Sequence, residues 1–257
     1  MYQTITTEVT GDVAVLTLNR PQVMNALTSL MRAELLEAFQ TAQTTARVIV
    51  LTGAGRAFCS GQDLADALSP GAFDVERVLN EEYVPLLKAI TDCPLPVIAA
   101  VNGTAAGAGA NLALACDVVI AAESASFIQA FTRIGLTPDA GGTYWLPRQI
   151  GMARAMGACL FAEGISAREA VNWGMIWEAV PDDRFIAHWR ARAAKLAAGP
   201  TQAYTAVKQA LRSSFDHDLD AQLALEAKLQ GDCGQTADFR EGVAAFLGKR
   251  PAQFTGK

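Results

Sequence analysis

The chain has 257 residues, of which 51% are hydrophobic and 18% are charged, and its net charge is −5 at neutral pH. This length and composition allow one domain with a full hydrophobic core, or one domain with an extension. The negative net charge and the scattered basic residues argue against nucleic-acid binding, and no apolar run reaches the roughly 20 residues of a membrane span. The first residues lack the features of a secretion signal, so a cytoplasmic protein is expected.

The elements can be taken in chain order from the spacing of apolar residues. The predicted elements of the first half are a strand at residues 12–19, a helix at 27–42, buried strands at 47–52 and 97–101, a short helix at 111–115 and a strand at 118–122. This alternation predicts an α/β fold with a parallel sheet. Residues 65–71 are interpreted as a loop.

After Gly142 the pattern becomes almost entirely helical. Ser166 and Glu169 have the spacing of a capping box, and residues 176–180 form a last predicted strand. From Thr201 onward three helical segments carry more apolar residues than a free-standing appendage would expose. We therefore divide the chain into a core at residues 1–199 and a helical C-terminal region at 200–257, which packs on the body or on a neighbouring subunit.

The five cysteines contain no Cys-x-x-Cys pair, which predicts free thiols rather than a disulfide framework or a zinc site. Cys59 has no histidine nearby in the sequence, so a thiol nucleophile is not expected. The two histidines, His188 and His217, lie in a polar stretch typical of surface positions. Asp63 and Asp117 follow turn or helix ends and are interpreted as structural carboxylates. We expect no metal and no resident cofactor.

Two glycine-rich turns carry the main signal for a catalytic site. Gly61 precedes Gln62 in one turn, and Gly107 precedes Ala108 in the other. Glycine lets the main chain approach a ligand closely, and the start of a helix leaves N–H groups unpaired. The amides of Gln62 and Ala108 are therefore predicted to form an oxyanion hole. Glycines that only permit tight turns would give the same pattern, and both interpretations stand at this point.

Asp139 is the candidate acid/base group, and it lies between Pro138 and a glycine-rich turn at residues 140–143. One hypothesis is that Asp139 caps the following helix, and the other is that it transfers protons. A catalytic Asp139 must face an apolar cavity that excludes water. Tyr144, Trp145 and Leu146 could form the walls of this cavity, and the two aromatic residues could instead belong to the core.

Motifs along essentially the whole chain resemble the crotonase, or enoyl-CoA hydratase/isomerase, superfamily. These motifs lie at residues 18–21, 25–27, 51–53, 58–64, 96–103, 106–111, 141–143 and 239–242. The resemblance implies a crotonase-type spiral of ββα units with a helical C-terminal trimerisation region. It also implies an acyl-CoA thioester substrate, whose oxygen would lie between the amides of Gln62 and Ala108, and a homotrimer or dimer of trimers. Coenzyme A is then part of the substrate.

The resemblance also indicates which chemistry to expect. Hydratases of the superfamily deliver the parts of water with two glutamates, and the matching positions here are Asn111 and Phe131. Asp139 matches the position where dienoyl-CoA isomerases carry an acid/base aspartate and a benzoyl-CoA dehalogenase carries its nucleophile. The resemblance therefore implies proton transfer, with nucleophilic attack as the alternative, rather than hydration.

Longer shared segments resemble the branch of the superfamily that isomerises ring-1,2-epoxyphenylacetyl-CoA to oxepin-CoA in phenylacetate degradation. These segments lie at residues 136–139, 141–143, 146–148, 154–157, 173–177, 240–243, 249–250 and 253–257. We expect an isomerase of this type, with 3-enoyl to 2-enoyl shifts as a secondary activity. The alternatives are an enoyl-CoA hydratase or 3-enoyl/dienoyl-CoA isomerase of fatty-acid β-oxidation, and a non-catalytic acyl-CoA binding subunit.

The expected substrate contacts extend beyond the two amides. They include Asp63, Leu64, Ala65, Asn111, Phe131, Tyr144, Trp145 and Lys249. Hydratases often have lysine at the positions of Gln22 and Ala65, which puts phosphate contacts there in doubt. Lys249 or Arg250 is therefore expected to supply charge for the CoA phosphates.

Overall fold

The computed structural model describes residues 2–67 and 74–257, which build a six-stranded sheet as their largest element. The strand order is β1-β2-β3-β5-β7-β10. The bounds are Ile5–Thr10 for β1, Val13–Leu18 for β2, Val48–Gly53 for β3, Val97–Val101 for β5, Val118–Ala122 for β7 and Glu178–Val180 for β10. Strand β1 runs antiparallel to β2, and the other neighbours are parallel.

A second, four-stranded sheet has the order β4-β6-β8-β9, and its strands have only three residues each. The bounds are Ala57–Cys59 for β4, Thr104–Ala106 for β6, Ser126–Ile128 for β8 and Gly164–Ser166 for β9. Three times in succession the chain passes from the large sheet into the small one, from β3 to β4, β5 to β6 and β7 to β8. This repetition is the predicted spiral.

Glycine makes two of these passages possible. A Cβ atom at Gly53 would lie 2.5 Å from the carbonyl oxygens of Ala57 and Phe58, and one at Gly103 would lie 2.2 Å from the carbonyl oxygen of Arg56. Real Cβ atoms do not approach backbone oxygens so closely, so the chain can turn sharply here only where the side chain is absent. The tight corners bring the small sheet against the large one.

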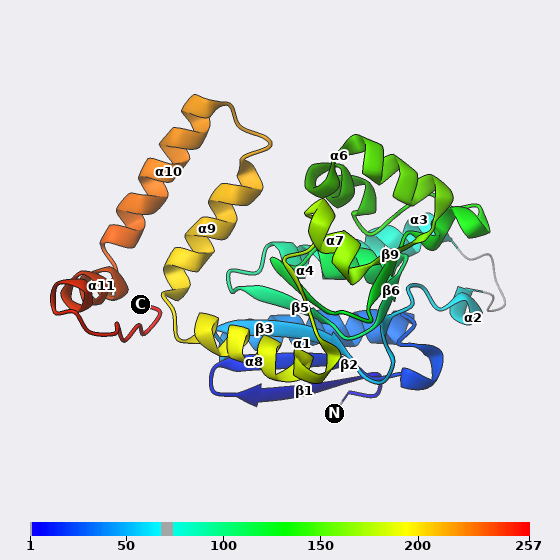
Figure 1. The fold of residues 1–257 in the computed structure, drawn as a ribbon, viewed down its shortest axis with the longest axis horizontal. Helices are drawn as coiled ribbons and strands as arrows, with labels where there is room; N and C mark the ends of the chain where they lie inside the picture. Colours follow the sequence, from blue (N-terminus) through cyan, green and yellow to red (C-terminus); the bar gives the residue numbers. More distant parts are fainter. Residues whose placement is uncertain (1, 68–73) are drawn as a thin grey trace.

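Helices connect and cover the two sheets (Figure 1). In the body they are η1 (Pro21–Val23), α1 (Ser29–Thr45), α2 (Leu64–Ala67), α3 (Val75–Val78), η2 (Leu79–Tyr83), α4 (Val84–Thr91), α5 (Ala108–Leu114), η3 (Ala130–Ile134), α6 (Gly142–Phe161), α7 (Ala167–Trp173) and α8 (Asp182–Ala197). Ser166 and Glu169 form the predicted capping box of α7. Segment η2 is a π-helical turn.

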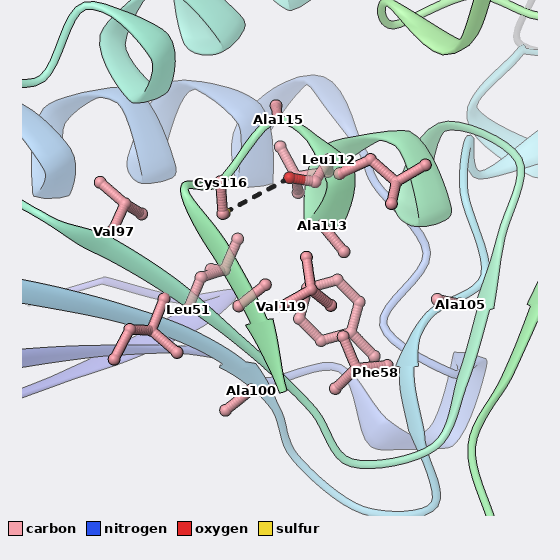
Figure 2. Packing of buried hydrophobic residues seen from close by; sticks show 14 of the residues in the cluster. Leu51, Phe58, Val97, Ala100, Ala105, Leu112, Ala113, Ala115, Cys116 and Val119 are labelled. Atoms are coloured by element: carbon pink, nitrogen blue, oxygen red, sulfur yellow. Dashed lines mark hydrogen bonds between the residues drawn. The ribbon is translucent and has the colours of Figure 1, made fainter. Parts of the chain in front are cut away.

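The core lies between the large sheet and α5 (Figure 2). Leu51 from β3, Phe58 from β4 and Val119 from β7 are buried there with Leu112 from α5. Burying a side chain of this size stabilises the fold by roughly 1.5–3 kcal/mol. All residues of α5 are buried, so the helix that follows the second glycine turn has a fixed position in the core.

The C-terminal helices form an arm that extends away from the body in Figure 1. The arm consists of α9 (Thr201–Ser213), α10 (Leu219–Gly234) and α11 (Ala237–Leu247). Asp117 holds the second half of α9 against the body through ion pairs to Lys208 at 2.6 Å and Arg212 at 2.8 Å. Phe246 and Leu247 are 83% and 76% exposed, so no described part of the chain covers these apolar side chains of the arm.

The predicted strands and helices correspond to β2, α1, β3, β5, α5, β7, α6, α7, β10 and the three helices of the arm. The loop predicted at residues 65–71 is wrong at its start, because Leu64–Ala67 is a helical turn. Residues 68–71 lie outside the described residues. The sequence analysis missed β1, the short strands of the small sheet and the helices from α3 to α4. Within the described ranges no helix has the length and apolarity to cross a membrane, and no cluster of potential ligands could hold a metal ion.

Asn25 ties the loop before α1 to the first corner, and we predict that its removal destabilises the fold. Its fully buried Nδ2 lies 2.9 Å from the carbonyl oxygen of Ala54 and 2.8 Å from that of Ala57. Asn25→Ala should lower the free energy of unfolding by about 2–4 kcal/mol, since it leaves buried carbonyls unpaired and puts alanine at a φ of 55°. Urea unfolding measures this loss. The control is Asn19→Ala at an exposed position, and equal stability of the two variants would contradict the prediction.

Candidate active site

The first glycine turn aims the amide of Gln62 away from the loop that holds it. The Leu27 N–H donates to the Gly61 carbonyl oxygen at 2.8 Å, and the Asp63 N–H donates to the Leu27 carbonyl oxygen at 3.1 Å. These two bonds make a parallel bridge between Leu27 and Gln62. In extended chain, the N–H of a residue points opposite to its neighbours' bonding groups. The Gln62 N–H is therefore directed away from Leu27.

The second glycine turn lies directly against the first. A Cβ atom on Gly61 would lie 3.4 Å from the backbone nitrogen of Ala108, the first residue of α5. Gly61 and Gly107 have φ angles of +91° and +52°, the left-handed region that favours glycine. Within the described chain, the N–H groups of Gln62 and Ala108 donate no hydrogen bond to another backbone group. Two adjacent unpaired donors are what an oxyanion hole requires.

Gly109 fixes the distance between these turns. A Cβ atom there would lie 2.4 Å from the carbonyl oxygen of Cys59 and 2.7 Å from its sulfur atom. The first turn of α5 can therefore pack on β4 only because Gly109 lacks a side chain. Burial raises the pKa of the Cys59 thiol to about 12, so this thiol stays protonated and is no nucleophile.

The structure separates the two hypotheses for Asp139. The residue that caps α6 is Gly141, and no side-chain hydrogen bond caps this helix. The capping role is therefore wrong. Instead, Oδ1 of Asp139 is buried and has no hydrogen-bond partner in the described structure. A buried carboxylate oxygen without a donor costs free energy, which is typical of a functional group rather than a structural one.

Burial raises the pKa of Asp139 to about 6, because a charged carboxylate is disfavoured away from water. The charge of Arg32 acts in the opposite direction and limits this rise. Asp139 also contributes to the raised pKa of Tyr83, which is mainly caused by burial. Asp139 therefore has a pKa close to neutral pH, where a carboxylate can both accept and return a proton.

Asn111 links the second glycine turn to Asp139. Its Nδ2 donates to the backbone carbonyl of Asp139 at 2.8 Å, and its Oδ1 accepts from Nε2 of Gln129 at 2.8 Å. Asn111 is fully buried, and it thus orients the turn that carries the carboxylate. Phe131 is buried as well, and its ring lies 3.7 Å from the position of a Cβ on Gly107. The site therefore brings together Gln62, Ala108, Asn111, Phe131 and Asp139.

Other predicted contact residues lie in different surroundings. Tyr144 packs edge-on against Trp145 with a centroid distance of 4.7 Å, and Arg148 stacks on Tyr144 at 3.7 Å. Arg212 of the arm lies 5.9 Å from the centre of the Trp145 ring. This aromatic pair thus faces the C-terminal end of α9, and its role as a wall for the acyl group stays a prediction.

Asp63 has the expected structural role, since it pairs with Arg20 at 2.8 Å and accepts from the Ala65 N–H. Leu64 and Ala65 are exposed at the mouth of the first turn. Lys249 follows α11 at the end of the arm, far from α2 in Figure 1. Substrate binding by these four residues stays a prediction.

An apolar cavity of about 610 Å³ borders the Asp139 turn. It is lined by Pro138 and Gly142 on either side of that turn, and by Leu146, Met152 and Met156 of α6. Leu146 was predicted as a wall residue, whereas Met152 and Met156 were not. Asp139 itself is not among the lining residues, so the cavity borders the turn that carries the carboxylate.

The sequence analysis also missed Arg32 and Tyr83, which surround Gln62. Arg32 Nη1 donates to Gln62 Oε1 at 2.8 Å, and the Tyr83 hydroxyl donates to the same atom at 2.8 Å. Arg32 lies on α1 beside the buried residues Met31 and Leu35. A charge on an otherwise buried helix face is a signal that could have identified it.

Comparisons with known proteins agree with this geometry. Residues 8–257 match the family described as enoyl-CoA hydratase/isomerase. A Rhodobacter capsulatus protein named "Probable enoyl-CoA hydratase" is 66% identical and covers 100% of this chain and 99% of its own. The 1,2-epoxyphenylacetyl-CoA isomerase of Escherichia coli is 47% identical and covers 100% of both. An enoyl-CoA hydratase structure from Bacillus anthracis has a TM-score of 0.94 at 34% identity and covers 99% of this chain and 100% of its own. The chain belongs to the enoyl-CoA hydratase/isomerase, or crotonase, family.

We predict that Asp139→Asn stabilises the fold above pH 6. The pKa of Asp139 is raised from 3.8 to about 6 on folding, so ionisation costs stability as pH rises through this window. One pKa unit corresponds to about 1.4 kcal/mol, and the gain above pH 6 should be on the order of 3 kcal/mol. Below pH 4 the gain should vanish. Urea unfolding of both proteins from pH 4 to 8 measures the difference, and a difference that is constant over this range would contradict the assignment.

Proposed function

We propose that the protein is an acyl-CoA isomerase in which Asp139 moves a proton while the amides of Gln62 and Ala108 hold the thioester oxygen. The observation that supports this most is the buried Oδ1 of Asp139, which has no hydrogen-bond partner among the described residues. Its turn is tied by Asn111 to α5, the helix that begins with the unpaired amide of Ala108. A partner for this oxygen would come with the substrate, as a C–H group next to the thioester.

The proposed reaction needs one carboxylate. Asp139 accepts the proton when the C–H bond beside the thioester breaks, and the electron pair passes into the enolate. The amides of Gln62 and Ala108 donate to the enolate oxygen, where the negative charge develops. Asp139 then returns the same proton to a carbon further along the conjugated system. No water, oxidant or reductant takes part, so atoms and electrons balance.

Hydration would require a second acid/base group. Asn111 is an amide whose two polar ends already bond to Gln129 and to the Asp139 turn, and Phe131 has no proton to transfer. These contacts favour isomerisation. A hydratase remains the second candidate, because the relative at 66% identity carries that name. A carboxylate that reached the site from elsewhere would support it.

We further propose 1,2-epoxyphenylacetyl-CoA as the substrate, converted to oxepin-CoA. In this isomerisation the C–C bond that the epoxide shares with the ring breaks as the seven-membered ring forms, and Asp139 moves a proton from the carbon beside the thioester to a ring carbon, so no atom or electron is gained or lost. The relative with this activity in its name is 47% identical over the full length of both chains. The apolar cavity beside Asp139 has room for a ring, and its lining by Leu146 and Met156 suits a flat apolar group.

Turnover of three thioesters tests the proposal. We expect the purified protein to isomerise 1,2-epoxyphenylacetyl-CoA and, more slowly, to convert a 3-enoyl-CoA to the 2-enoyl-CoA. We expect it not to hydrate crotonyl-CoA. Asp139→Asn should lower kcat by ~100-fold or more with little change in binding, because it keeps shape and removes the base. For the wild type, kcat/KM should fall below pH 6 as Asp139 becomes protonated. Efficient hydration of crotonyl-CoA with no reaction of the other two would overturn both substrate and mechanism.

We also propose that the arm covers a second copy of this chain in a homotrimer. An apolar groove of about 1050 Å³ runs between α9, α10 and α11, and Val207, Leu223 and Phe246 are among its lining residues. Exposed apolar surface of this size favours association. Lys249, at the end of the arm, would then approach the CoA of a neighbouring subunit.

Phe246→Asp should dissociate the proposed trimer, because it places a charge in the apolar groove of the arm. Sedimentation velocity should show a smaller species than the wild type. Val9→Asp, at a 55% exposed position on β1, serves as the control and should leave the wild-type species unchanged. A wild-type protein that sediments as a monomer would rule out this assembly.

A further inference from the structure

Arg32 is a buried charge that the proposed reaction has not yet used. Its side chain is 1% exposed, although it lies on α1 among core residues. Burying a guanidinium is costly unless every N–H group finds an acceptor. Its contacts therefore indicate what it is retained for.

On one side, Arg32 is anchored by Glu82. The Glu82 Oε2 atom accepts from Nη2 at 2.6 Å and from Nε at 3.0 Å. The Tyr83 ring covers the guanidinium at 4.7 Å. Both residues belong to η2, the π-helical turn, so α1 and η2 together fix the orientation of the guanidinium plane. Turns of this kind often occur at functional sites.

On its other side, Arg32 contacts both Gln62 and Leu27, the residue that forms the bridge with Gln62. Its Nη1 donates to the Gln62 side chain at 2.8 Å and to the Leu27 carbonyl oxygen at 3.0 Å. The same Leu27 carbonyl accepts from the Asp63 N–H. One nitrogen thus contacts the residue that offers the amide and the strand that directs it.

Arg32 also acts on Asp139 through its charge. Among the described residues, Asp139 interacts electrostatically with Arg32 from α1 and with Tyr83 from η2. Behind these two lie Cys59 of β4, which acts on Tyr83, and Glu82 of η2, which contacts Arg32. Burial raises the pKa of both Tyr83 and Cys59, so both are neutral at working pH. Glu82 is paired with Arg32. The guanidinium is therefore the positive charge that favours ionised Asp139.

We propose that Arg32 is a positioning residue that couples the two halves of the site. It holds the Gln62 amide in the direction of the thioester oxygen, and its charge keeps the Asp139 carboxylate available as a base. This inference rests on the proposed function, since it assigns Arg32 a part in the same proton transfer. A purely structural Arg32 would affect stability and leave both the kcat and the ionisation of Asp139 unchanged.

Two substitutions separate the contributions of geometry and charge. Arg32→Lys keeps the charge and loses the planar fork, so kcat should fall about tenfold with little change in KM or in the acid limb of kcat/KM against pH. Arg32→Met loses both, so kcat should fall further and the acid limb should move upward by at least half a pH unit. Arg77→Met is the matched control, because Arg77 pairs with Glu82 at 3.6 Å, is 50% exposed and makes no contact with Gln62 in the described structure. It should leave both quantities unchanged.

Tyr83→Phe keeps the ring over Arg32 and removes one hydrogen bond to Gln62, so it serves if the Arg32 variants fold poorly. It should lower kcat several-fold without moving the pH limb. Unchanged kcat in Tyr83→Phe and Arg32→Lys would overturn the positioning role.

A measurement without substrate keeps this inference separable from the proposed function. The stability difference between Asp139 and Asp139→Asn, followed by urea unfolding against pH, reports the ionisation of Asp139 directly. The pH midpoint of this stability difference should move to higher pH when Arg32→Met is introduced into both the Asp139 protein and the Asp139→Asn variant. It should stay unchanged when Arg77→Met is introduced instead. If no acyl-CoA is turned over, the proposed function fails and this shift still tests the charge of Arg32. If turnover occurs and neither midpoint nor kcat responds to Arg32→Met, the inference fails alone.

Discussion

The site depends on the close approach of two backbone turns, which absent side chains make possible. A Cβ atom on Gly61 would lie 2.8 Å from the Ala106 carbonyl oxygen, and one on Gly109 would lie 2.4 Å from the Cys59 carbonyl oxygen, distances that no Cβ could occupy. Because β4 and the start of α5 touch in this way, two N–H groups far apart in the chain become neighbours. The small sheet of three-residue strands holds this contact in register. Preorganised donors of this kind need no reorganisation when charge develops.

The second constraint is electrostatic. Oδ1 of Asp139 is buried without a hydrogen-bond partner in the described structure, and the burial of the charged carboxylate lowers the stability of the fold. Asn111 and Gln129 satisfy the backbone of the turn and leave the carboxylate oxygen free. Stability is thus lower where the chemistry needs an unsatisfied group, which is a common compromise at active sites.

The difference between hydratase and isomerase chemistry depends on few side chains. Asn111 and Phe131 stand where the resemblance places the two glutamates of hydratases, while the oxyanion turns and the fold are retained. In this chain Asn111 donates a hydrogen bond to the Asp139 turn, and the ring of Phe131 lies beside Gly107. Function is therefore argued from the site, because the same spiral can carry either chemistry.

Local spacing was enough to predict much of this protein from its sequence. Residues close together in the chain determine the long periodic elements, such as β3, β5 and α1. The same holds for the capping box at Ser166 and for the two glycine turns. The three-residue strands of the small sheet are too short for any period, and only pairing across the chain creates them. Asp139 could be located by sequence, yet its burial, its distance from a capping position and its charged neighbour required the tertiary structure. Arg32 and Gln62 are 30 residues apart, and η2 brings Glu82 to the same point from 50 residues away. Such contacts are determined by packing, because burial and charge act through space rather than along the chain.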